Sequence, residues 1–224
     1  MNVIGISGFA RCGKDTFVGI ATNILTKNNY RPMRVAFADV LKDDIDPWLK
    51  DKYGISAWTE DPEEKKIIRP FLVAHGCGKR MQTQGQHWID LVDQKLTSVV
   101  QDCLEGGESS DRIVALVSDV RFPNEATWVR NDWGGELIHL KRYVISDLHS
   151  LSGECYLGQR LYDPAPNEEE SVQDPLVFAM SDYRVEWESR GKLTVGEAIQ
   201  TPYLQGIVFD VLNKTKVFNG SMSK

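Results

Sequence analysis

The sequence predicts an α/β fold in which helices cover both faces of a mostly parallel β-sheet. Short apolar segments alternate with stretches of helical periodicity along most of the 224 residues. This alternation is typical of parallel sheets with crossover helices. A glycine-rich turn directly after the first apolar segment supports the same fold class. The predicted strands are residues 3–7, 34–38, 113–118, 136–140 and 183–187.

Helical periodicity is clearest between these strands. Apolar residues recur every three or four positions after Thr16, and again from Trp88 to Cys103. Such spacing places them on one face of a helix. Pro123 has the position of a first-turn proline. Thr194 and Glu197 have the spacing of a capping box, which predicts a short helix over residues 194–200.

Two long segments interrupt the alternation. Residues 43–66 are rich in charge, and residues 143–180 contain glycines, prolines and the run Glu168-Glu169-Glu170. Long irregular connections in compact domains are often lids or binding loops, and a decorated surface is the alternative. We therefore expect a lid-like segment over residues 143–180.

The whole chain, residues 1–224, is expected to form a single domain. Its core would comprise residues 1–142 and 181–202. Residues 203–224 are predicted to form a C-terminal β-hairpin, because two apolar segments flank Asn213-Lys214. Whether this hairpin makes the chain a homodimer stays open.

Composition and charge argue against several classes of protein. The net charge of −6 argues against a protein that coats nucleic acid, because phosphate neutralisation needs a basic face. No apolar run is long enough to span a bilayer, and the start has no signal-peptide pattern. The four cysteines contain no CxxC pair, so we expect free thiols in the cytoplasm; two disulfides are the alternative. They are Cys12, Cys77, Cys103 and Cys155.

The strongest signal is the segment Gly8-Phe9-Ala10-Arg11-Cys12-Gly13-Lys14, which follows a strand and opens a helix. Glycines let backbone N–H groups turn toward phosphates, and the helix N-terminus adds partial positive charge. A lysine at this position reaches the β- and γ-phosphates of a nucleotide. This segment predicts ATP binding by Gly8, Arg11, Cys12, Gly13, Lys14, Asp15 and Thr16.

The segment departs from the usual P-loop in one place. Asp15 stands where serine or threonine normally follows the lysine, and Thr16 comes next. Asp15 has a carboxylate that is able to bind Mg²⁺ directly or through water. Alternatively, Asp15 caps the helix and Thr16 binds the metal.

A second carboxylate follows the buried strand over residues 113–118. Asp119 lies at the carboxyl end of this strand, where open α/β sheets bind ligands, and Arg121 follows it. Asp119 is expected to order Mg²⁺ or orient the acceptor, and the alternative is a simple strand-ending turn. Arg142 and Arg160 are candidates to neutralise the transferring phosphoryl group.

Arg69 and Arg80 lie in a helical region that leads to Trp88. Arginine grips phosphate in a bidentate manner, and an aromatic ring stacks on a base. A nucleoside monophosphate acceptor needs both. The alternative interpretation places the arginines on the surface and Trp88 in the core, where the apolar stripe favours it.

These motifs together resemble bacteriophage-type deoxynucleoside monophosphate kinases. The resemblance is carried by Gly13-Lys14-Asp15-Thr16, by Phe37-Ala38-Asp39 with Leu41-Lys42, by Arg69, Gly76, Arg80 and Trp88, by Ser118-Asp119-Val120-Arg121-Phe122-Pro123-Asn124-Glu125, by Gly134-Gly135 with Lys141-Arg142, and by Asp182-Tyr183-Arg184-Val185. It covers most of residues 1–200. It departs at Glu186-Trp187-Glu188, where an Asn-Asp-Gly turn is expected.

The resemblance implies a nucleoside monophosphate kinase-like three-layer fold, ATP as phosphoryl donor, Mg²⁺ and a deoxynucleoside monophosphate acceptor. The implied location is the cytoplasm, that of the host if a phage encodes the chain. The implied catalytic residues are Lys14, Asp119, Arg121 and Arg142, and the metal ligands are Asp15, Thr16 and Asp119. The implied acceptor contacts are Asp39, Lys42, Arg69, Arg80, Trp88 and Glu125.

The sequence therefore predicts phosphorylation of small molecules, with no nucleic-acid or membrane partner. Three alternatives stay open: a kinase with another acceptor such as dephospho-coenzyme A, an ATP-driven nucleic-acid enzyme, and a non-catalytic nucleotide-binding protein.

Overall fold

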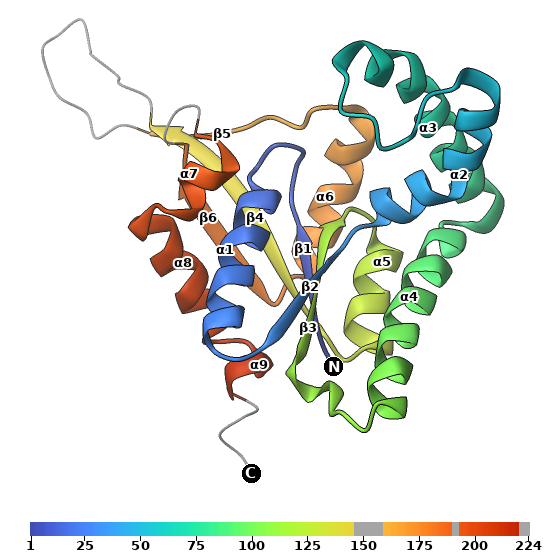
Figure 1. The fold of residues 1–224 in the computed structure, drawn as a ribbon. Coiled ribbons are helices and arrows are strands. Elements are labelled where there is room, and N and C mark those ends of the chain that lie inside the picture. Colours follow the sequence, from blue (N-terminus) through green and yellow to red (C-terminus); the bar gives the residue numbers. More distant parts are fainter. Residues whose placement is uncertain (146–158, 190–192, 220–224) are drawn as a thin grey trace, which may run out of the picture. The chain divides into compact units, whose positions relative to one another are not determined.

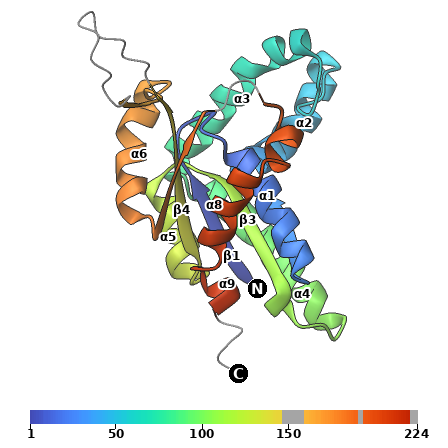
Figure 2. The same cartoon turned by 90° about the vertical axis from the view of Figure 1, so that its left-hand side faces the viewer.

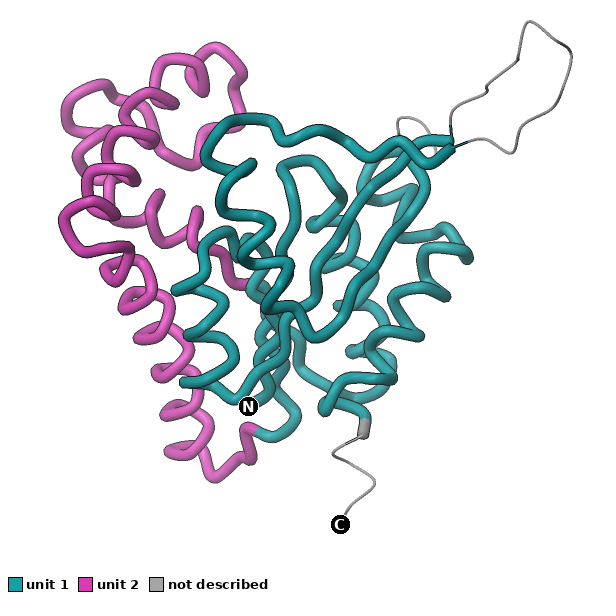
Figure 3. Tube along the Cα trace, turned by 180° about the vertical axis from the view of Figure 1, so that it is seen from behind, with its two compact units in different colours: residues 1–34, 111–224 teal, residues 35–110 magenta. Residues whose placement is uncertain are grey.

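The computed structural model describes residues 1–145, 159–189 and 193–219 (Figure 1). The chain divides into two compact units (Figure 3). Unit 1 comprises Met1–Arg34 and Asp111–Lys224, and unit 2 comprises Val35–Ser110. Unit 2 is thus one continuous segment inserted into the sequence of unit 1.

A six-stranded sheet forms the centre of unit 1, in the order β2-β3-β1-β4-β5 with β6 also paired to β4. The pairs β1–β3, β1–β4 and β4–β6 are parallel, and β4–β5 is antiparallel. The predicted α/β class with a mostly parallel sheet is therefore confirmed. The strands are β1 (Asn2–Ser7), β2 (Arg31–Val35), β3 (Ile113–Val120), β4 (Glu136–Ile145), β5 (Arg160–Tyr162) and β6 (Tyr183–Glu188).

The second strand differs from its predicted range of 34–38. It ends at Val35, and a helix begins at Phe37. Ala36 has the extended backbone of a residue that precedes a helix. The apolar residues after Val35 therefore face a helical core rather than continuing the strand.

Helices cover both faces of the sheet in unit 1 (Figure 2). One face carries α1 (Lys14–Lys27) and α8 (Pro202–Leu212), and α7 (Val195–Ile199) packs against α1. The other face carries α5 (Pro123–Thr127) and α6 (Glu168–Met180). A short π-helix (Trp128–Asp132) follows α5, and a short α9 (Lys216–Asn219) ends the described chain. The core against α1 includes Ile4, Ile6, Phe17, Ile20, Leu25, Leu116, Ile138, Trp187, Val208 and Leu212.

The predicted C-terminal β-hairpin is wrong, because residues 202–212 form the helix α8. Leu204, Val208, Val211 and Leu212 are the buried residues of this helix. Their spacing of three and four matches the helical period, and Pro202 occupies the first turn, where its missing N–H costs nothing.

The segment expected to be lid-like is partly regular. It contains β5 and the helix α6, whose N-terminus is capped by Asn167. Helix α6 packs against β1, β4 and α5, so residues 168–180 belong to the layer that covers the sheet. Residues 146–158 of the expected lid lie outside the described residues.

Three helices make up unit 2, and they contact one another in all three pairs. They are α2 (Phe37–Tyr53), α3 (Pro62–Thr83) and α4 (Gln86–Glu105). A small core of Ile45, Leu49, Ala57 and Ile68 fills the space between α2 and α3. Most of the charged segment over residues 43–66 lies in α2 and α3 and is helical. Its apolar residues recur at helical spacing, which places them on one face of each helix.

None of the described helices is both long enough and apolar enough to cross a membrane. Three of the four cysteines are free thiols: Cys12, Cys77 and Cys103. Cys155 lies outside the described residues.

Candidate active site

The loop between β1 and α1, in which the sequence predicts phosphate binding, has three residues with left-handed backbone. Gly8, Arg11 and Gly13 all have positive φ, at 126°, 67° and 103°. A Cβ on Gly8 would lie 2.3 Å from the carbonyl oxygen of Leu140, so only glycine allows the loop to approach β4 this closely. The Cys12 N–H donates to the carbonyl oxygen of Phe9 at 3.2 Å, which closes the loop on itself.

Lys14 points back into this loop. Its Nζ donates to the carbonyl oxygens of Gly8 at 2.6 Å and Phe9 at 2.8 Å, and the residue is 9% exposed. Both partners are uncharged, so the positive charge of the ammonium remains available to an anion. The ammonium group of Lys14 therefore lies against the backbone of the loop in which the sequence predicts phosphate binding.

Trp187 on β6 forms the floor of the loop, a role that the sequence did not reveal. Its indole Nε1 donates to the carbonyl oxygen of Cys12 at 2.8 Å. A Cβ on Gly13 would lie 2.5 Å from Cζ2 of Trp187, so the ring occupies the space that any side chain there would need. The only sequence signal was the departure from the family pattern at Glu186-Trp187-Glu188.

Glu170, in the first turn of α6, also contacts the loop. Its Oε2 accepts a hydrogen bond from the Ala10 N–H at 2.8 Å, and its Oε1 lies 3.5 Å from Nη1 of Arg121. The residue is only 8% exposed. The run of three glutamates is visible in the sequence, but no local pattern connects it to the phosphate loop.

The expected carboxylate and arginine lie at the end of β3. Val120 is the register partner of Ser7, so the carboxyl end of β3 lies beside the strand that enters the loop. Asp119 is half-buried and Arg121 is exposed. The structure thus brings Asp119, Arg121 and the P-loop to the same edge of the sheet.

The proposed contact between Glu125 and an acceptor is corrected by its burial. Glu125 is 1% exposed, and its Oε2 accepts hydrogen bonds from the N–H groups of Arg121 at 2.8 Å and Phe122 at 3.2 Å. Its carboxylate therefore caps α5 and fixes the backbone of Arg121. A capping glutamate at this helix position satisfies N–H groups that the helix leaves unpaired.

Arg142 on β4 forms an ion pair with Asp163, with Nη2 and Oδ2 2.7 Å apart. On the same strand, His139 Nε2 lies 2.9 Å from Asp174 Oδ1, and His139 is 1% exposed. The sequence does not indicate the roles of Asp163 and Asp174, because each is far in sequence from its partner, Arg142 or His139. Arg160, the other candidate cation, is bound to Glu186 at 3.1 Å.

Burial raises the pKa of the Cys12 thiol, and the charge of Lys14 partly opposes this shift. A thiol in this environment stays protonated and unreactive. Cys12 therefore contributes its backbone to the loop rather than its sulfur to chemistry.

Asp15 and Thr16, the predicted metal ligands, lie in the first turn of α1 directly after Lys14. The Asp15 side chain is 75% exposed and lies 4.0 Å from Nη2 of Arg34. Among the described residues, no group of three or more His, Cys, Asp or Glu side chains is arranged to hold a metal ion. Asp15, Thr16 and Asp119 would together offer the one or two oxygens that Mg²⁺ takes from a protein when nucleotide phosphates and water supply its other ligands.

The predicted acceptor residues of unit 2 are distributed over its three helices. Asp39 and Lys42 lie on α2, Arg69 and Arg80 on α3. Lys42 is placed over the ring of Trp58, with Nζ 4.5 Å from the ring centroid.

Trp88 is a core residue, which corrects its expected role in stacking on a base. It is 1% exposed, and its Nε1 donates to the carbonyl oxygen of Gly76 at 3.3 Å. Its position on the apolar stripe of α4 explains this burial.

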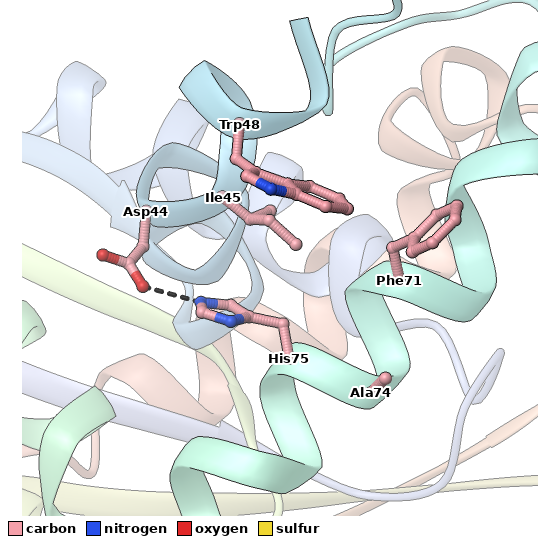
Figure 4. A pocket seen from close by; sticks show the side chains of 6 residues that line it. All are labelled: Asp44, Ile45, Trp48, Phe71, Ala74 and His75. Carbon is pink, nitrogen blue, oxygen red and sulfur yellow. Dashed lines mark hydrogen bonds and ion pairs between the residues drawn. The ribbon is translucent and has the colours of Figure 1, made fainter. Parts of the chain in front are cut away.

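A cavity of about 440 Å³ lies between α2 and α3 within unit 2 (Figure 4). Trp48 and Phe71 flank its apolar part, and Asp44 and His75 form its polar end, with Oδ2 and Nε2 2.7 Å apart. Trp48 remains 44% exposed although its ring contacts Phe71. The lining residues are Asp44, Ile45, Trp48, Phe71, Ala74 and His75.

No protein-family model matches this chain, and no curated protein matches it. Among solved structures, shikimate kinase from Aquifex aeolicus aligns over 99% of both chains with 10% identity and a TM-score of 0.39. Shikimate kinase from Acinetobacter baumannii in complex with shikimate aligns over 100% of this chain and 96% of that chain, with 10% identity and a TM-score of 0.38. Scores this low carry no argument, so the fold class rests on the strand order and the loop geometry.

Proposed function

We propose that this chain is a P-loop phosphotransferase that moves the γ-phosphoryl group of ATP to a deoxynucleoside monophosphate. The observation that carries the proposal is Lys14, whose buried ammonium lies inside the loop of positive-φ residues at the start of α1. This arrangement concentrates backbone N–H groups and one positive charge on a site that suits a triphosphate.

In the transfer, an oxygen of the acceptor phosphate forms a bond to the γ-phosphorus of ATP. The bond between that phosphorus and the β,γ-bridging oxygen breaks, and ADP leaves with the electron pair. The acceptor phosphate is already an anion, so the step needs positioning and charge neutralisation more than a general base. Mg²⁺, when bound with the nucleotide, supplies further charge neutralisation at the phosphates.

Lys14 and Arg121 are the cations that we assign to the transferring group. Arg121 is 44% exposed at the side chain, and the backbone of Arg121 is fixed by Glu125. Arg142 is neutralised in part by Asp163, so its charge contributes less. Asp119 is assigned to orient Mg²⁺ or the acceptor from the end of β3.

The cavity in unit 2 supports an acceptor with a flat ring. Trp48 offers an exposed aromatic face, and Asp44 offers a carboxylate to the N–H groups on the edge of a base. Arg69 and Arg80 on α3 are assigned to the acceptor phosphate, because arginine binds phosphate in a bidentate manner. Trp48 and Asp44 replace Trp88 as the proposed base contacts.

The test is a coupled assay of ADP release with ATP, Mg²⁺ and each deoxynucleoside and ribonucleoside monophosphate in turn. We expect turnover that depends on one or more deoxynucleotides. Lys14→Ala should lower kcat by about a hundredfold or more while the melting temperature stays near that of the wild type. An active Lys14→Ala protein would overturn the assignment.

The same assay separates the alternatives. Turnover with dephospho-coenzyme A instead of nucleotides would keep the phosphotransferase and change the acceptor. ATP binding without turnover on any acceptor would favour a non-catalytic nucleotide-binding protein. ATP hydrolysis stimulated by nucleic acid would favour an ATP-driven nucleic-acid enzyme.

A further inference from the structure

Glu170 joins two parts of the site that come from different elements of unit 1. One carboxylate oxygen accepts from the Ala10 N–H of the phosphate loop at 2.8 Å. The other lies 3.5 Å from Nη1 of Arg121, which follows β3. A single buried side chain thus contacts both the donor loop and the arginine that the proposed function assigns to the transferring group.

The position of this carboxylate is fixed by its own helix. The Glu170 N–H donates to Oδ1 of Asn167 at 2.8 Å, which caps α6. Val177, further along the same helix, is 1% exposed in the layer that covers β1 and β4. Because α6 is held at its N-terminus and along its buried face, the Glu170 side chain starts from a rigid backbone.

Arg121 is held both at its backbone and at its guanidinium. Glu125 accepts a hydrogen bond from its backbone N–H, and Glu170 contacts its guanidinium. A guanidinium carries five N–H donors, so one contact to Glu170 leaves the others for phosphate oxygens. Carboxylates that orient a charged side chain in this way raise the fraction of time that it spends in the productive geometry.

We propose that Glu170 is a positioning residue that fixes the first half of the phosphate loop through Ala10 and holds Arg121 toward that loop. The Arg121 half of this inference rests on the proposed function. The Ala10 half concerns nucleotide binding alone.

A competing role for the same contact makes the opposite prediction. If the triphosphate needs the Ala10 N–H that donates to Glu170, ATP would have to displace the Glu170 carboxylate. Removing Glu170 would then tighten ATP binding. If Glu170 supports the loop, removing it weakens ATP binding.

The chain provides its own matched control. Glu168, Glu169 and Glu170 are consecutive, but only Glu170 is buried. Glu169 is exposed, and its side chain forms no hydrogen bond or ion pair with another described residue. Glu169→Gln therefore removes the same charge from the same helix turn without touching the loop.

The experiment compares wild type, Glu170→Gln, Glu170→Ala and Glu169→Gln by ATP dissociation constant and by kcat and KM with the best acceptor. Glu170→Gln keeps an oxygen for the Ala10 N–H and loses the charge that holds Arg121. We expect its ATP dissociation constant to stay near that of the wild type, while kcat falls by about tenfold to a hundredfold.

Glu170→Ala loses both contacts. We expect a similar loss of kcat together with ATP binding weakened by about tenfold, which corresponds to one hydrogen bond of about 1.4 kcal/mol. Glu169→Gln should match the wild type in every measurement. Melting temperatures show which variants are folded, and the isosteric Glu170→Gln keeps the test decisive if Glu170→Ala unfolds.

Tighter ATP binding in Glu170→Ala, or wild-type kcat in Glu170→Gln, would overturn the proposal. If the wild type binds ATP but phosphorylates no acceptor, the proposed function fails and the dissociation constants decide alone. Weaker binding in Glu170→Ala with wild-type binding in Glu170→Gln would then support the role of Glu170, and equal binding in all variants would overturn it.

Discussion

The indole of Trp187 donates a hydrogen bond to the carbonyl oxygen of Cys12 at 2.8 Å while its ring lies against Gly13. A residue of the last strand thereby determines which residue is tolerated in a loop near the start of the chain. The glycine is required twice, once for its φ of 103° and once because the ring leaves no room for a Cβ.

Gly13→Ala should therefore disrupt the phosphate loop. The left-handed backbone alone costs an alanine about 1–2 kcal/mol, and the contact with Trp187 adds to this. We expect a lower melting temperature and ATP binding weakened by more than about tenfold, measured by calorimetry.

Gly206→Ala is the matched control for this change. Gly206 lies within α8, and a Cβ there would meet no atom within 4 Å. Alanine in a helix is favoured over glycine by about 0.5–1 kcal/mol, so this variant should melt at the same or a higher temperature and bind ATP normally. Equal loss of ATP binding in both variants would contradict the role of Trp187.

Trp48→Ala tests the cavity between α2 and α3. Stacking of an aromatic side chain on a base contributes about 1–3 kcal/mol, so the KM for the acceptor should rise by about fivefold or more while the KM for ATP is unchanged. Leu104→Ala serves as the control, because Leu104 is an exposed apolar residue of α4 that does not line the cavity. An acceptor KM that responds to Leu104 and not to Trp48 would place the base elsewhere.

Thiol labelling distinguishes the cysteines. Burial raises the pKa of Cys12, whereas Cys77 is exposed. N-ethylmaleimide at neutral pH should modify Cys77 rapidly and Cys12 only after denaturation, as peptide mass spectrometry would show. Labelling of Cys12 in the folded protein at the rate of Cys77 would show that the loop opens readily.

Alkaline pH should destabilise the protein through Tyr183. Burial, reinforced by the Glu136 carboxylate 2.8 Å from its hydroxyl, raises the pKa of Tyr183 from 10.0 to about 12. The folded state therefore holds this proton more tightly than the unfolded state does. The stabilisation is complete below pH of about 10 and is lost as pH rises through about 12.

Urea denaturation between these pH values would measure this effect. In Tyr183→Phe the titrating group is absent, so the free energy of unfolding should decline less steeply with pH than in the wild type. Tyr53→Phe, which removes a hydroxyl from an exposed residue of unit 2, should keep the wild-type slope. Identical slopes in all three proteins would assign the alkaline transition to another group.

The parts of this protein that could be predicted from sequence are those determined by neighbouring residues. Strands β1 and β3 are short and mostly apolar, and the phosphate loop is one continuous motif that ends at Lys14. Strand β4 continues to Ile145, five residues beyond its predicted end, which the sequence does not indicate because its last residues are not a continuous apolar run. The short apolar run over residues 206–212 is compatible with a strand or a helix, so the sequence alone does not decide between them. Packing against α1 favours the helix.

The contacts that the sequence did not reveal connect distant positions. Glu170 lies 160 positions after Ala10, and no local pattern distinguishes it from Glu168 and Glu169. The burial of Trp88 and the exposure of Trp48 are likewise not evident from local sequence, because both residues lie on amphipathic helices. Only the packing of unit 2 buries Trp88 and leaves Trp48 exposed.

The contact between Trp187 and the phosphate loop affects when the loop takes its final structure during synthesis. Cys12 and Trp187 are 175 positions apart, so the loop leaves the ribosome long before the ring that supports it. Contacts of such high sequence separation form late, after the entropy of closing the intervening chain has been overcome. A nascent chain that ends before β6 would expose the glycines of an unsupported loop. The proposed nucleotide binding therefore requires a chain that extends at least as far as Trp187.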